Sequence, residues 1–230
     1  MDGPFVVGFD GSDTATEAVR LTTMLADAVG AEVIVADAFV PGRDVAQGLR
    51  EIARRAGAGL LAVGRTHHGP VGRALADSVP DQLLRHAPCP VLVVPPGRRA
   101  TTAVIGVAFD GRETSLAALA IARDLAGDLD AEVVLLGVGN LRLGLPFDPL
   151  AYSDIECRTL HGPPAGAIEA ECAQGIDLLV AGSRDYGPAQ VVVAGNVSRH
   201  LAHHAPCPVL VVPRGARDRL RAARPTVGAA

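Results

Sequence analysis

A ten-residue stretch occurs twice in this chain. Residues 86–95 read HAPCPVLVVP, and the same ten residues return at 204–213, 118 positions later. Two shorter matches lie nearer the front: Phe-Asp-Gly at 9–11 and 109–111, and Ala-Glu-Val at 31–33 and 131–133, each 100 positions apart. Self-similarity on this scale indicates a duplicated unit. Because the offset grows from 100 to 118, the second copy has 18 more residues in its middle.

The duplication divides the chain into two predicted domains. A cluster of Pro, Gly and Arg residues at 95–99 marks the joint between the copies. We therefore expect one domain at residues 1–96 and a second at 97–215. The remaining segment, 216–230, is basic and is expected to be a flexible tail.

Apolar runs alternate with longer amphipathic stretches in each copy, which predicts alternating strands and helices. In copy one the predicted strands are 5–9, 32–39, 60–63 and 91–94, and the predicted helices are 14–28, 45–55 and 71–85. The spacing of Thr14 and Glu17 fits a capping box at the start of the first helix. Copy two repeats this order from 104 to 212 and adds a strand at 155–160. The alternation indicates an α/β fold with parallel sheets covered by helices on both faces.

The extra strand of copy two has a natural place in a doubly wound sheet. In the strand order 3-2-1-4-5, strand 3 lies at an edge and can be lost without dividing the sheet. We expect two such sheets in tandem, with copy one lacking edge strand 3. The last strand of each copy then forms the opposite edge, which suits Pro88 and Pro90 because proline cannot donate a ladder hydrogen bond. Since open edges pair, we expect either the two copies to join along this strand or a homodimer to form through it.

The composition excludes several classes of protein. Hydrophobic residues make up 49% of the chain and aromatic residues only 3%, which suits the aliphatic core of a parallel sheet. A formal charge of −4 argues against nucleic-acid binding, and the apolar runs are too short for a membrane span. The N-terminus shows no secretory signal, so we expect a soluble, cytoplasmic protein with reduced thiols. The cysteines are Cys89, Cys157, Cys172 and Cys207.

Three segments of each copy are expected to meet at the carboxyl ends of the strands, where ligands bind in doubly wound sheets. One segment follows the first strand, one follows the strand before the last helix, and one opens that helix. In copy one the candidate binding residues are Asp10, Gly11, Gly64 and Ser78. In copy two they are Asp110, Gly111, Gly182, Ser183, Arg184, Gly195, Asn196, Val197 and Ser198.

Together with the repeated APCPVLVVP ending, these segments resemble the universal stress proteins over about residues 4–214. The resemblance implies the 3-2-1-4-5 sheet and a family with ATP-binding and non-binding members. Binding members carry a pattern G-x2-G-x9-G-S/T, followed by a small apolar and a hydroxyl residue, which holds the phosphates through backbone amides and hydroxyls. The resemblance also implies that the Asp after strand 1 holds the adenosine end, together with a residue ending strand 2. That residue is Val138 in copy two and Ala38 in copy one.

Both copies depart from the binding pattern. Copy one has His67 and Asp77 at the second and third glycine positions, and copy two has Asp185 at the second. A carboxylate about 5 Å from a phosphate charge costs about 3 kcal/mol at an effective dielectric of about 20. Asp77 stands where amides should meet the phosphates, whereas copy two keeps Gly195 and replaces only the following Ser/Thr, by Asn196. Copy two is therefore predicted to be the better nucleotide site.

Each candidate residue also has a structural interpretation. Asp10 and Asp110 fit helix caps as well as nucleotide ligands, and Gly64 and Gly182 fit tight turns as well as phosphate contacts. The cysteines suit core packing better than nucleophilic catalysis. The following histidines suit solvent-exposed positions better than metal ligation: His67, His68, His200, His203 and His204.

These observations lead to one expected function and one alternative. We expect a stress-response protein that binds adenine nucleotide, specifically ATP with Mg²⁺ able to accompany it, and that has little or no catalytic activity. The alternative is a non-binding family member whose duplicated sheet acts as a dimerisation or interaction module. An enzyme acting on nucleotides is disfavoured because the sequence shows no evident base, nucleophile or metal-binding carboxylate pair.

Overall fold

The structure is a computed structural model, and it describes residues 2–37, 44–65, 78–97, 101–139, 152–183 and 197–213. We refer to residues 2–97 as the first half and to 101–213 as the second half. The strands are β1 Phe5–Phe9, β2 Val33–Asp37, β3 Leu60–Gly64, β4 Val91–Val94, β5 Val104–Phe109, β6 Glu132–Val138, β7 Glu156–Leu160, β8 Leu178–Gly182 and β9 Val209–Val212. The helices are α1 Asp13–Val29, α2 Val45–Ala56, α3 Val79–His86, α4 Glu113–Leu129, α5 Pro164–Cys172 and α6 Val197–His204.

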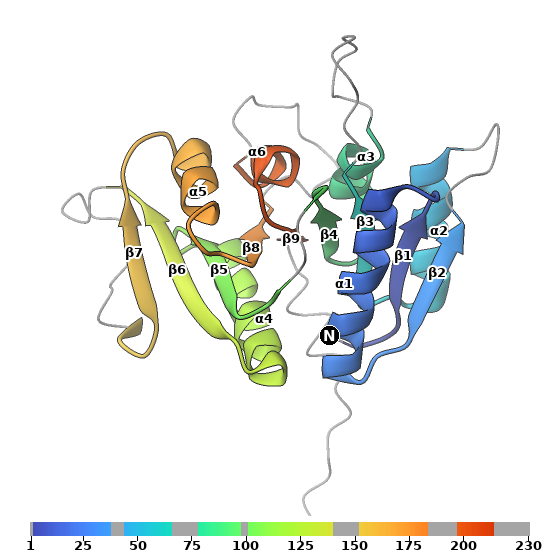
Figure 1. Cartoon of the computed structure of the whole chain (residues 1–230), viewed down its shortest axis with the longest axis horizontal. Helices are drawn as coiled ribbons and strands as arrows, with labels where there is room; N and C mark the ends of the chain where they lie inside the picture. Colours follow the sequence, from blue (N-terminus) through green and yellow to red (C-terminus); the bar gives the residue numbers. More distant parts are fainter. Residues whose placement is uncertain are drawn as a thin grey trace, which may run out of the picture.

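The strands form a single sheet in the order β2-β1-β3-β4-β9-β8-β5-β6-β7, with helices packed on it (Figure 1). Within each half every strand pair is parallel. The prediction of an α/β fold with a mainly parallel sheet and alternating helices is confirmed. The second half has β7 outside β6, whereas β2 is the outermost strand of the first half in the part of the chain that the structure describes.

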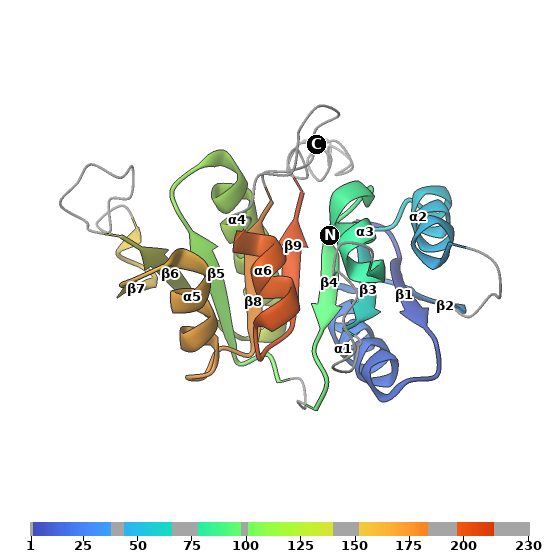
Figure 2. The same ribbon diagram turned by 90° about the horizontal axis from the view of Figure 1, so that it is seen from above.

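The sequence led us to expect two sheets that either join along their last strands or pair with a second chain, and in the structure they are joined into one continuous sheet. The halves join through β4 and β9, which lie side by side and antiparallel at the centre (Figure 2). In this pairing Leu92 faces Leu210, its own counterpart in the repeat, flanked by Val91 opposite Val211 and Val93 opposite Val209. The two halves are therefore related by a local two-fold axis at Leu92 and Leu210. The union removes two open edges, which would otherwise expose unpaired backbone groups.

Two apolar layers, one on each face of the sheet, run across both halves. One contains buried residues of α1 and α4 together with Phe5, Val107 and Leu210. The other contains buried residues of the remaining helices, α2, α3, α5 and α6. Because each layer includes side chains from both halves, the halves share their core as well as their sheet.

The element boundaries differ from the expected ones mainly at helix starts. The first helix begins at Asp13 with Ser12 as its N-cap, so the capping box predicted for Thr14 and Glu17 is wrong. Ser12 is the N-cap because its extended backbone lets its Oγ accept a hydrogen bond from the Ala15 amide. Of the helix predicted at 71–85, residues 71–77 lie outside the described residues, and the described helix α3 starts at Val79. Among the described residues, no helix has the length and apolarity needed to cross a bilayer.

Candidate functional site

Three of the predicted site residues of the second half lie at the ends of neighbouring strands. β5 pairs with β6 on one side and with β8 on the other. Asp110 follows the last residue of β5, Val138 ends β6 and Gly182 ends β8. Because these strands are parallel, the three residues share one edge of the sheet. This is the edge at which doubly wound sheets bind ligands.

The glycines after the first strand of each half are required by the backbone. Gly11 has a φ of 79° and Gly111 a φ of 75°, in the left-handed region that disfavours side chains. Both lie between a strand and the helix that follows it. This turn needs glycine whether or not a ligand binds.

The glycines that end β3 and β8 are required by a close approach of two segments. A Cβ on Gly182 would lie 2.4 Å from the Thr114 carbonyl oxygen, and a Cβ on Gly64 would lie 2.7 Å from the Thr14 carbonyl carbon. The missing side chain lets the strand end touch the first turn of α4 in the second half and of α1 in the first. This contact brings Gly182 beside the segment that starts at Asp110.

The aspartates after the first strands organise the turns before α1 and α4. The Asp10 carboxylate accepts hydrogen bonds from the Ser12 backbone amide at 3.0 Å and from its hydroxyl at 2.6 Å. These bonds, the hydroxyl bond foremost, hold the pKa of Asp10 below its usual value. Asp110 accepts a hydrogen bond from the Arg112 amide at 3.1 Å. Its other carboxylate oxygen lies 4.0 Å from the Arg112 guanidinium. Both aspartates therefore support a helix start.

The two helix starts differ in their caps. Ser12 caps α1 with its side chain, whereas the equivalent Arg112 makes no side-chain cap on α4. We expect Arg112→Ser to raise the free energy of unfolding by about 1 kcal/mol, because a serine at an N-cap satisfies a free helix amide. Chemical denaturation of this variant beside Ser12→Ala, which should lose a similar amount, checks the prediction. Equal stability of Arg112→Ser and the wild type would contradict it.

In the first half, the candidate Ser78 is engaged by a buried carboxylate. Ser78 is the N-cap of α3, and its hydroxyl donates to an Asp81 carboxylate oxygen at 2.7 Å. Asp81 is only 1% exposed. A negative charge this close to the hydroxyl opposes a phosphate at the same place. The first half is thus a poorer anion site than its sequence motif alone indicates.

Asp81 also contacts two basic side chains from the second half. Arg199 donates from Nε at 2.6 Å and the Nε2 of His203 lies at 2.8 Å, both at Oδ1 of Asp81. Burial by itself would raise the pKa of Asp81, but the hydrogen bonds from His203, Arg199 and Ser78 outweigh it and hold this pKa well below its ordinary value. We call Asp81, Arg199 and His203 the junction cluster, since it joins α3 to α6 across the two halves.

Of the α6 histidines, His204 is exposed and the side chain of His200 is 40% exposed, whereas His203 is not solvated as the sequence suggested. His203 is largely buried in the junction cluster, His200 contacts a Glu169 carboxylate oxygen at 2.9 Å, and the His204 ring stacks on His200 with centroids 4.2 Å apart. The expectation of solvent exposure is wrong for His203, because α3 of the other half covers it. Within the described residues no group of three His, Cys, Asp or Glu side chains has the arrangement of a metal site.

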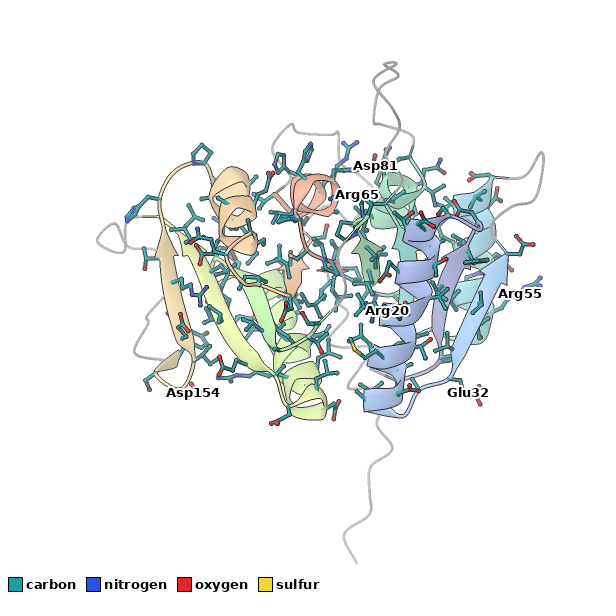
Figure 3. All side chains as sticks on the ribbon, viewed as in Figure 1. Arg20, Glu32, Arg55, Arg65, Asp81 and Asp154 are labelled. Carbon is teal, nitrogen blue, oxygen red and sulfur yellow. The ribbon has the colours of Figure 1, made fainter. Side chains whose placement is uncertain are left out.

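A second contact between the halves starts at the end of β3. The Arg65 guanidinium donates to the carbonyl oxygens of Ala205 at 3.0 Å and Ala202 at 3.4 Å, at the carboxyl end of α6. Cationic donors are favoured at this end of a helix. Figure 3 shows Arg65 and Asp81 at the boundary between the halves. Sequence reasoning did not single out either residue.

Several predicted site residues fall outside the described residues, so the candidate site is only partly outlined. Of the second half's residues, Ser183 is buried after β8, and Val197 and Ser198 form the first turn of α6, with Ser198 buried. Among the cysteines, Cys89, Cys172 and Cys207 are buried, as expected for packing residues. The residues outside the described ranges are Ala38, His67, His68, Asp77, Arg184, Asp185, Gly195, Asn196 and the tail 216–230.

Comparison with known proteins identifies the family. Residues 38–95 and 148–213, which include the last strand of each half, match the universal stress protein family. This chain belongs to the universal stress protein family. Universal stress proteins of Mycobacterium bovis and Mycobacterium tuberculosis are each 29% identical to it, over 66% of this chain and 58% of theirs. The chain thus spans less than two thirds of the length of these relatives.

Solved structures share the fold. A universal stress protein from Archaeoglobus fulgidus aligns with a TM-score of 0.70 at 17% identity, covering 94% of this chain and 97% of its own. A protein of unknown function from Pseudomonas aeruginosa aligns with a TM-score of 0.59 at 20% identity, covering 90% and 80%. At these identities the likeness establishes the architecture of a universal stress protein, and its ligand must be argued from the residues.

Proposed function

We propose that this universal stress protein binds an adenine nucleotide, ATP with Mg²⁺ able to accompany it, in its second half, and that it has little or no catalytic activity. The observation that carries the proposal is the position of Asp110, Val138 and Gly182 at three adjacent strand ends. In the family's binding members, the corresponding residues contact the adenosine end and the first phosphates. The proposal includes a division into two copies at 1–96 and 97–215.

The hydrogen bond made by Ser78 supports the second half over the first as a nucleotide site. In the first half a buried Asp81 carboxylate lies against Ser78. At the equivalent position of the second half stands Arg199, 118 residues further on. Arg199 and Asp81 compensate each other in one ion pair, so the difference between the halves lies in Ser78, whose hydroxyl already donates to a carboxylate and is not available to a phosphate.

The test compares equivalent residues of the two halves. We expect Asp110→Ala to weaken ATP binding about tenfold, since a hydrogen bond to a charged group contributes about 1.5 kcal/mol. Asp10→Ala is the matched control, and we expect it to leave ATP affinity unchanged. Isothermal titration calorimetry with Mg-ATP measures both. No heat and no thermal shift of the wild-type protein at millimolar ATP would overturn the proposal, and equal losses in both variants would overturn the preference for the second half.

The alternative function is an interaction module that binds no nucleotide. It is favoured by the glycines, because Gly11, Gly64, Gly111 and Gly182 are all explained by the backbone without a ligand. The same calorimetry separates the two functions, since an interaction module gives no ATP-dependent signal.

A further inference from the structure

Near the local two-fold axis, contacts between the halves can be compared with the contacts that two identical halves would make. Asp81 and Arg199 are 118 residues apart, the same offset as Leu92 and Leu210, so each is the other's counterpart in the repeat. Likewise His203 is the counterpart of Arg85. In a symmetric pair of identical halves, a residue at this position would face its own copy. The duplicated chain has instead placed opposite charges on the two sides.

The charges that meet at the junction differ among the possible pairings of two halves. Two second halves paired through β9 would bring two Arg199 and two His203 side chains together without the Asp81 carboxylate. Two first halves paired through β4 would bring two Asp81 carboxylates together at the axis, with Arg85 at the position that His203 occupies in the second half. Only a first half against a second half supplies one carboxylate to both Arg199 and His203, at 2.6 Å and 2.8 Å.

Because Asp81 is buried, the difference in electrostatic energy between these pairings is large. Its side chain is fully buried, while those of Arg199 and His203 are 33% and 12% exposed. Like charges that are kept from water repel more strongly than exposed ones, and an unpaired buried charge is costly. Polar groups that decide between alternative partners are a known use of buried charge.

We propose that the junction cluster determines which half each half accepts: Asp81 and Arg199 match a first half to a second half and disfavour the pairing of two second halves. The antiparallel β4 and β9 edges supply the attraction, which by itself does not distinguish the halves, because both carry the sequence VLVV. The charges at positions 81 and 199 determine which halves pair. This inference does not depend on nucleotide binding.

The test uses full-length chains with inverted charges. Asp81→Arg leaves position 81 and Arg199 both cationic, and Arg199→Asp leaves Asp81 and position 199 both anionic. We expect each single variant to lose about 5 °C or more in melting temperature, which at this chain length corresponds to roughly 2 kcal/mol. The double variant Asp81→Arg with Arg199→Asp is expected to recover most of the loss, because opposite charges again face each other.

The choice of partner is measured in mixtures of two variant chains. The two single variants, carrying tags of different mass, are unfolded in urea, mixed and refolded together, and native mass spectrometry counts the chains in each particle. We expect a mixed dimer, since each half of one chain now matches a half of the other. Two differently tagged wild-type chains, and two double-variant chains, should give no mixed dimer. A control inversion inside the second half, Arg158→Glu opposite Glu171, should also give none.

Each outcome bears on the proposal. Mixed dimers from the single variants alone support it, including the case where either variant is insoluble on its own but is recovered in the mixture. If the single variants lose stability, the double variant regains it and the mixture still contains no mixed dimer, the cluster stabilises the junction without choosing the partner, and the proposal is overturned. Full stability of both single variants also overturns it.

Discussion

Asp81→Ala is expected to lower the free energy of unfolding by about 3 kcal/mol. Breaking a buried ion pair from one side costs about 3–5 kcal/mol, and the low end applies because Arg199 is one-third exposed and keeps some solvent. The variant would leave Arg199 and His203 facing each other without a counter-charge. Urea unfolding followed by circular dichroism measures the loss. Asp154→Ala is a suitable control, because Asp154 forms an exposed ion pair with Arg123 and should lose less than about 1 kcal/mol.

The same residue gives the stability a pH dependence of known sign. The folded pKa of Asp81 lies below the value of about 3.9 expected in the unfolded chain. Its contribution is therefore complete above about pH 4 and is lost as the pH falls through the lowered folded pKa. The stability difference between the wild type and Asp81→Ala should shrink as the pH falls below about 4, the value expected in the unfolded chain. A difference that grew on acidification would contradict this assignment.

Gly182→Ala is expected to lower the free energy of unfolding by about 3 kcal/mol, at the upper end of the usual cost of overpacking. The new Cβ would lie 2.4 Å from the Thr114 carbonyl oxygen, which is backbone and cannot rotate away. The end of β8 would have to move from the first turn of α4. We also expect ATP binding to be lost, because this movement separates Gly182 from Asp110. Denaturation curves and calorimetry with Mg-ATP test both effects.

The matched control for this substitution is Gly127→Ala. Gly127 lies inside α4, and a Cβ there meets nothing within 4 Å. Alanine should therefore stabilise the protein by about 0.5–1 kcal/mol, through the lower entropy of the unfolded chain and the better helix propensity. If both glycine variants lost similar stability, the close contact at Gly182 would not be the cause.

The sequence was sufficient to predict the elements and their class, for a simple physical reason. Strands such as Val91–Val94 are continuous apolar runs, and a strand buried on both faces must be apolar along its whole length. The same logic placed Asp110, Val138 and Gly182 at one edge of the sheet, because parallel strands end together. Helix starts were harder, since Ser12, Asp13 and Thr14 all suit a cap and the φ and ψ of Ser12 decide among them.

The junction cluster could not be predicted by the same means. Local patterns describe one element at a time, whereas Asp81 and Arg199 meet only after the two halves dock. A signal was nonetheless present in the sequence. The two copies agree closely over HAPCPVLVVP, yet a few residues earlier they carry opposite charges at equivalent positions. A charge reversal between repeats next to a shared edge strand indicates that the repeats face each other there.

The antiparallel meeting of β4 and β9 also fixes where the chain can hold other molecules. Since all strands of one half run against those of the other, their carboxyl ends emerge on opposite rims of the sheet. A small molecule on one rim is separated from the other rim by the length of the strands. Two ligands of different size or chemistry, one at each rim of the sheet, would therefore not compete for space.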